Sequence, residues 1–196
     1  MWFFVFEKSR KKLGGINMKE NGTKQLVLSG VFIALGIVLP MAFHLFGGGG
    51  PMFLPMHIPV LLAGFFLSMP YAIAVGIITP LLSSLFTGMP PMFPVLPYMM
   101  LELATYACMV SFLYQKKGLN VYISLIGSMI AGRIMAGLGV WILAQFFAAK
   151  MPGPIVFITG AVGKGLPGII IQIIFIPILI IALQKNNLVS QNKKVA

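Results

Sequence analysis

The chain of 196 residues is strongly apolar: 59% of its residues are hydrophobic, only 9% are charged, and the mean hydropathy is +0.99. A soluble domain of this length cannot hide so much apolar surface, because much of a small globule faces water. The composition therefore excludes an ordinary soluble domain and indicates a protein whose main solvent is lipid.

The net charge of +11 comes from 14 basic residues against three glutamates, Glu7, Glu20 and Glu102. In a soluble protein such an excess would indicate a nucleic-acid partner. Here the basic residues stand mostly at the chain ends and between apolar runs, so we expect no nucleic acid and interpret them as topology signals. The single cysteine, Cys108, excludes an intrachain disulfide and a CxxC motif.

Six apolar runs predict transmembrane helices, because a bilayer core of roughly 30 Å needs about 20 apolar residues per helix. The runs cover approximately residues 26–46, 58–69, 71–86, 95–114, 121–147 and 155–183, and the second run is short. We therefore predict an all-α membrane protein. Its parts are a basic cytoplasmic leader (1–25), a single six-helix transmembrane domain (26–184) and a cytoplasmic tail (185–196).

The distribution of basic residues predicts the orientation in the membrane. Six precede the first helix, Lys116 and Lys117 follow the fourth helix, and three lie in the tail, whereas Lys150 alone falls on the opposite side. Lys and Arg are retained on the cytoplasmic side of short loops. Both termini are therefore expected in the cytoplasm, with the chain crossing a bacterial-type plasma membrane several times.

This orientation places three connections rich in Gly, Pro and Met on the outer side, at residues 47–57, 87–94 and 151–154. Gly and Pro also simply end helices. Their concentration on one side, together with the pliant apolar side chains of Met and Phe, nevertheless favours a lid over a site. The predicted lid residues in the first of these loops are Gly49, Gly50, Pro51, Met52 and Phe53.

Three charged residues, Glu102, Arg133 and Lys164, lie well inside the apolar runs. On insertion scales a charge at the centre of a helix in hydrocarbon costs about 2.5–3.5 kcal/mol, so each should face protein or a polar site. From the helical rise, they should lie about 10, 12 and 13 Å below the outer surface, respectively. The sequence thus predicts one charged layer in the outer half of the membrane.

Residues four apart share a helix face and add neighbours to this layer. The stripes are Tyr98, Glu102 and Tyr106; Arg133, Gly137, Trp141 and Gln145; and Gly160, Lys164, Gly168 and Gln172. Two cations, one carboxylate and aromatic walls would form a pocket, with His57 at the end of the first outer loop. The predicted substrate-binding residues are Glu102, Arg133, Lys164, Tyr98, Tyr106, Trp141, Gln145 and His57.

A purely structural alternative is an internal ion pair of Glu102 with either Arg133 or Lys164. One carboxylate neutralises one cation, however, and the surplus positive charge favours an anionic guest. Metal coordination by His44, His57 and nearby Met residues is a weaker alternative. Because the sequence holds no paired carboxylates and no metalloprotease motif, we predict no catalytic residues, no metal site and no cofactor.

Over residues 23 to about 183 the chain resembles the substrate-binding S components of energy-coupling factor (ECF) vitamin transporters. The resemblance rests on six helices with both ends inside, on Gly30-x-x-x-Ala34 in the first helix, and on residues 53–59 (FLPMHIP) and 87–91 (TGMPP). In that family a strip of small residues, usually alanines, meets the transmembrane coupling subunit. Gly30 here replaces the first alanine, so the resemblance implies docking at Gly30 and Ala34.

The resemblance also implies high-affinity capture of a water-soluble vitamin or precursor near the outer surface. It further implies that the S component delivers the vitamin by tilting over within the membrane, while two cytoplasmic ATPases hydrolyse ATP. This chain has no Gly-x-x-x-x-Gly-Lys-Ser/Thr loop, so ATP hydrolysis would belong to those partners. Metal-specific relatives hold nickel or cobalt with the terminal amine of a Met-His-Ile segment. Here Met56-His57-Ile58 is internal, which argues against a metal substrate.

The favoured substrate is anionic because of Arg133 and Lys164, with pantothenate as the leading candidate. A hydroxymethylpyrimidine or a pyridoxine-type ligand, stacked on the aromatic residues, comes second. Two other classes stay open. One is a structural or assembly membrane protein with an internal ion pair, and the other, which has least support, is an intramembrane enzyme.

Overall fold

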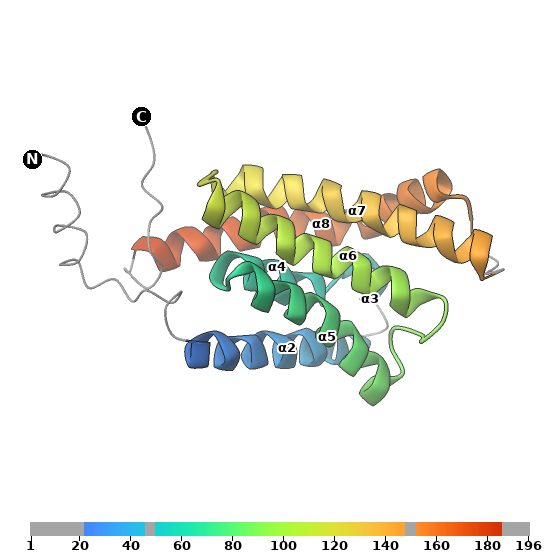
Figure 1. The fold of residues 1–196 in the computed structure, drawn as a ribbon, viewed down its shortest axis with the longest axis horizontal. Helices are drawn as coiled ribbons and strands as arrows, with labels where there is room; N and C mark the ends of the chain where they lie inside the picture. Colours follow the sequence, from blue (N-terminus) through green and yellow to red (C-terminus); the bar gives the residue numbers. More distant parts are fainter. Residues whose placement is uncertain (1–21, 46–49, 148–151, 186–196) are drawn as a thin grey trace, which may run out of the picture.

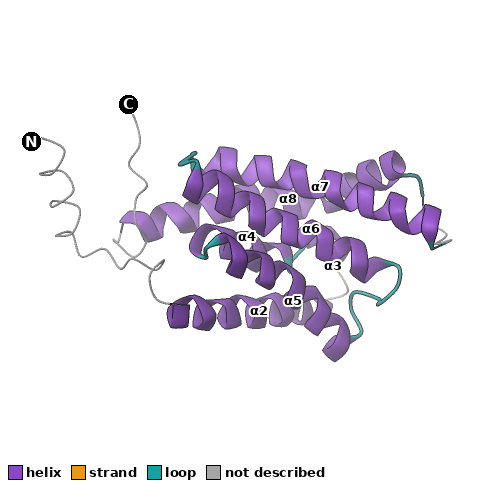
Figure 2. Ribbon diagram, viewed as in Figure 1, coloured by secondary structure: helices purple, strands orange, loops and turns teal. Residues whose placement is uncertain are grey.

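The computed structural model describes residues 22–45, 50–147 and 152–185, and over this part of the chain every regular element is helical (Figure 2). The elements are α2 (Gly22–Leu45), α3 (Gly50–Phe53), α4 (His57–Phe66), α5 (Met69–Thr87), α6 (Val95–Val110), the π-helical segment η1 (Ser111–Lys116), α7 (Val121–Phe146) and α8 (Pro154–Lys185). Most of the predicted leader and nearly all of the predicted tail lie outside the described residues.

Among the described residues, five helices are long and apolar enough to cross a membrane: Gly22–Phe43, Met69–Thr87, Val95–Lys116, Val121–Phe146 and Pro154–Leu183. This confirms the predicted all-helical membrane protein, and the predicted runs agree closely with the observed helices. The helix α4 is too short to be such a span, because its 10 residues extend only about 15 Å, whereas the hydrocarbon core is roughly 30 Å thick. The described residues thus hold five candidate spans and one shorter apolar helix, and the count of six spans stays a prediction.

The long helices lie side by side, and the first residue of α2 and the last of α8 are at the same end of the molecule (Figure 1). We call this the terminal end; it also holds the turn between η1 and α7. The opposite, loop end holds the connection between α5 and α6 and the start of α8. Which side of the membrane each end faces stays a prediction.

The short helix α4 lies in the core, and Val60, Leu61 and Ala63 are fully buried. Glycines let its neighbours approach closely. A Cβ on Gly64 would lie 2.7 Å from Cβ of Val110, and a Cβ on Gly76 of α5 would lie 2.7 Å from the Ala104 backbone. Both α4 and α5 therefore pack directly against α6, while large apolar side chains cover the outward faces of the long helices.

The end of α4 needs hydrogen-bond donors, since the last carbonyls of a helix have no partner within it and hydrocarbon offers no water. η1 supplies them. The Nε2 of Gln115 donates to the carbonyl oxygen of Gly64 at 3.0 Å and also to that of Leu67, and the Ser111 hydroxyl donates to Leu67 O at 3.2 Å. These bonds allow a helix of this length to end inside the bundle.

Replacing Gln115 with Leu should therefore destabilise the fold, because the α4 carbonyls would stay buried without this donor. We expect a loss of about 1–3 kcal/mol, measured as a lower melting temperature in detergent. Thr105→Val is the control, since the Thr105 hydroxyl bonds the Leu101 carbonyl of its own helix and is exposed. Equal shifts for the two variants would contradict this role for Gln115.

Candidate functional site

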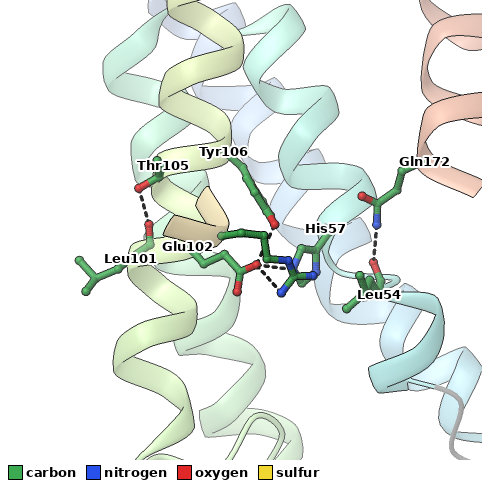
Figure 3. A network of polar contacts seen from close by, with 8 residues as sticks. Leu54, His57, Leu101, Glu102, Thr105, Tyr106 and Gln172 are labelled. Carbon is green, nitrogen blue, oxygen red and sulfur yellow. Dashed lines mark hydrogen bonds and ion pairs between the residues drawn. The ribbon is translucent and has the colours of Figure 1, made fainter. Parts of the chain in front are cut away.

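A buried carboxylate on α6 is the centre of the polar network within the described residues. Glu102 is 2% exposed, and its Oε1 lies 2.8 Å from Nη1 of Arg133 on α7. The Tyr106 hydroxyl, one turn further along α6, donates to the same oxygen at 2.7 Å. Figure 3 shows Tyr106 and His57 directed toward Glu102. Glu102 thus pairs with Arg133, which decides between the two cations that the sequence offered.

His57, the first residue of α4, brings a third element to this carboxylate. Its Nε2 lies 3.7 Å from Glu102 Oε1, and its ring centroid lies 5.5 Å from that of Tyr106. The imidazole is buried, and within the described structure neither ring nitrogen makes a hydrogen bond. His57 is therefore a buried polar group with hydrogen-bonding capacity to spare.

A glycine on α7 makes the ion pair possible. A Cβ on Gly132 would lie 2.2 Å from two ring carbons of Tyr106 and 3.1 Å from the Glu102 carbonyl oxygen. No side chain fits there without moving the Tyr106 ring. Gly132 therefore lets α7 approach α6 where the next residue, Arg133, must reach Glu102.

The segment between α3 and α4 rests on α8. A Cβ on Gly168 would lie 2.5 Å from the carbonyl oxygen of Phe53, and a Cβ on Gly165 would lie 2.9 Å from Cδ1 of Leu54. Gln172 lies within 3.5 Å of the Leu54 carbonyl (Figure 3). Leu54 itself has a φ of 50°, a left-handed conformation that turns the chain from α3 into α4.

The predicted lid is partly visible in this segment. Of its five residues, Phe53 contacts α8 through its backbone and Met52 is about half exposed. Gly49 lies outside the described residues, and for Gly50 and Pro51 only the backbone is described. A closing function for this segment stays a prediction.

Lys164 and Tyr98 lie beside the network rather than within it. The Lys164 side chain is exposed, and no described acidic residue lies within ion-pair distance of it. Tyr98 is half-buried, and its ring meets the ring of Phe157 on α8 edge-on, with centroids 5.0 Å apart. α8 therefore packs against this region through the Phe157 ring and two close-packed glycines, Gly165 and Gly168, while Lys164 is exposed.

The predicted stripes drift around their helices. Each step of four residues turns a helix by about 40° beyond a full turn, so three steps move a side chain by about 120°. On α7 the side chain of Arg133 faces α6, but Trp141 is 46% exposed and Gln145 is exposed as well. The structure does not bring Trp141 and Gln145 to the network, and a binding role for them stays a prediction.

Sequence reasoning missed Phe157 and Leu54 as neighbours of the site. The sequence does not indicate the turn at Leu54, because leucine rarely adopts a positive φ. The sequence predicts Gln172 on the same stripe as Lys164 and suggests no partner for it. The structure places its side chain beside the Leu54 carbonyl.

Chemically, the arrangement offers hydrogen-bonding groups and charge in a buried setting. The ion pair of Glu102 and Arg133 is neutral as a unit, and Lys164 on α8 is an exposed cation with no described acidic residue within ion-pair distance. Within the described residues no group of three or more His, Cys, Asp or Glu side chains could hold a metal ion. The site therefore favours recognition of a polar small molecule.

A family model described as "ECF transporter, substrate-specific component" matches residues 24–180, well over half of the chain. A comparison with curated proteins and another with solved structures gave no match.

The ion pair generates a test by paired substitutions. Glu102→Gln should leave the Arg133 charge buried without a counter-ion and cost about 3–5 kcal/mol of stability, and Arg133→Met should do the same to Glu102. The double variant should be more stable than the sum of the single losses implies. Melting temperatures in detergent check this, with Lys117→Met as an exposed control. Strictly additive losses would contradict a direct pair.

Proposed function

This chain belongs to the substrate-specific components of ECF transporters, and from that premise we propose that it captures a water-soluble vitamin or vitamin precursor for import. It is a multi-pass membrane protein and a transport subunit rather than an enzyme. The family implies association with an ECF module and a small-molecule substrate. The single observation that carries the proposal is the buried polar network of Glu102, Arg133, Tyr106 and His57.

The position of this network suits capture from outside a bacterial-type plasma membrane. Glu102 lies about 10 Å along α6 from Val95, and Lys164 about 15 Å along α8 from Pro154, so both are in the loop-end half of the bundle. The segment of Met52 and Phe53 rests on α8 at the same level as a candidate lid. A substrate entering from the loop end would reach these groups first.

Two substrate types fit the residues present. An anion such as pantothenate would use the positive charge of either Lys164 or Arg133. A hydroxymethylpyrimidine or pyridoxine-type ring would stack on an aromatic side chain, for which Tyr98 is half-buried while Tyr106 is only 1% exposed. His57 offers a hydrogen bond to either type.

A second candidate function comes from the completeness of the ion pair. Glu102 and Arg133 satisfy each other without a ligand, as they would in a structural or assembly subunit whose charges only fix helix packing. An intramembrane enzyme has least support, since the family that the chain matches is a family of transport subunits.

The docking surface is proposed on α2. Gly30 and Ala34 are exposed, and a Cβ on Gly30 would meet no atom within 4 Å. Such a flat strip allows another helix to approach closely. We assign it to the transmembrane coupling subunit, which would link this chain to two cytoplasmic ATPases.

Native mass spectrometry of the detergent-purified chain tests the capture function. We expect a vitamin-sized molecule to be released in a 1:1 ratio to the protein. Its occupancy should fall in His57→Ala, because this substitution removes the imidazole that would hydrogen-bond the ligand. Cys108→Ala is the matched control. Protein that is empty and also ignores a panel of vitamins would instead support the structural role.

Gly30→Leu and Ala34→Leu test the docking surface. Each should reduce co-purification with a co-expressed coupling subunit and ATPases by about tenfold or more, since a bulky side chain holds the helices apart. Binding of the vitamin should not change, because a side chain at Gly30 meets open space and Ala34 is exposed. Ala182→Leu, at an exposed position on α8, is the control. Normal assembly of both α2 variants would exclude this strip as the docking site.

A further inference from the structure

We propose that Lys164, and not Arg133, is the charge-recognition residue of this chain, and that its substrate carries a single negative charge, as a monocarboxylate does. This inference rests on the proposed function and narrows the class of substrate that the site takes.

Arg133 is already neutralised. Its Nη1 lies 2.8 Å from Glu102 Oε1, and a substrate anion placed there would meet the like charge of that carboxylate. The other terminal nitrogen, Nη2, lies 3.7 Å from where a Cβ on Gly165 would be, so the α8 backbone passes close to it. Arg133 therefore offers little free charge to a ligand.

Lys164 has no such partner among the described residues. Glu102 is the one acidic residue described, and it pairs with Arg133. Lys164 lies about 15 Å along α8 from Pro154, inside a helix that is long and apolar enough to cross a membrane. A cation at that depth is costly, and an anion beside it would offset the cost.

Lys164 is an exposed residue at the edge of the face that α8 packs against the bundle. Phe157, two turns before it, contacts the Tyr98 ring of α6, and Gly168, one turn after it, packs on the Phe53 carbonyl. Side chains at these spacings share a face. Lys164 thus lies on α8 between a contact with α6 and a contact with the candidate lid.

The space beside Lys164 is open. A Cβ on Gly160, one turn earlier on α8, would meet no atom within 4 Å, and neither would one on Gly163. Lys164 itself is exposed between the two inward contacts of Phe157 and Gly168. There is therefore room for a small anion to reach the ammonium group.

The charge balance then defines the substrate. The pair of Glu102 and Arg133 contributes no net charge, so among the described site residues, with histidine counted as neutral, one positive charge is left, on Lys164. One negative charge on the ligand neutralises the site completely, whereas a dianion would bury an excess charge and a cation would be repelled. The uncharged ring ligands would leave Lys164 unsatisfied.

The experiment compares carboxylates with neutral counterparts of similar shape. Dissociation constants are measured in detergent for pantothenate and pantothenol, nicotinate and nicotinamide, and biotin and biotinamide, with pyridoxine and hydroxymethylpyrimidine added as ring ligands. The proteins are the unmodified full chain, Lys164→Gln, Lys164→Arg, Arg133→Gln and, as a control at the terminal end, Lys117→Gln.

We expect one carboxylate to bind and its neutral counterpart to bind at least tenfold more weakly. Lys164→Gln should weaken the carboxylate by about 10- to 100-fold, the range of one charge-assisted hydrogen bond, and leave the neutral counterpart unchanged. Lys164→Arg should restore most of the affinity. Lys117→Gln should have no effect.

Other results would overturn the inference. Equal binding of the neutral member, preferential binding of a ring ligand, or a carboxylate preference that depends on Arg133 alone would refute it while leaving vitamin capture intact. A phospholipid that co-purifies in native mass spectra and is lost only in Lys164→Gln, with unchanged vitamin affinities, would assign the ammonium group to a lipid phosphate instead. A chain that binds no member of the panel would overturn the proposed function and this inference together.

Discussion

A charged side chain in the hydrocarbon layer has no water around it, and the contact between Glu102 and Arg133 is how this chain meets that constraint. The contact requires α6 and α7 to approach closely, which Gly132 permits. Tyr106 and His57 complete the surroundings of the carboxylate, so the start of α4 is fixed there too. The placement of three helices thus depends on one buried carboxylate.

The same constraint acts at the other end of α4. A helix of 10 residues cannot reach both membrane surfaces, and its last carbonyls must find donors inside the protein. Ser111 and Gln115 provide them from η1, which continues α6. One continuous stretch, α6 with η1, therefore holds α4 at its beginning through Glu102 and at its end through Gln115.

Such an arrangement suits a subunit that must hold its cargo without reacting with it. The ion pair balances its own charges, so a ligand's charge is left for a residue outside the pair. The candidate docking strip is on α2, which packs on α4 and α5, whereas the site draws on α6, α7 and α8. Under the proposed function, substrate recognition and docking to the coupling subunit would use different helices.

The sequence by itself determined the apolar runs, their bounds and the identity of the rare membrane charges, because the bilayer imposes length and composition on each helix separately. It also predicted one layer for Glu102, Arg133 and Lys164, since depth can be estimated from the helical rise. Only the tertiary structure decided which cation pairs with Glu102, that Trp141 faces outward, and how Leu54 turns the chain. The rotation of each helix about its axis is set by close contacts at glycines, and neither composition nor four-residue spacing fixes that rotation.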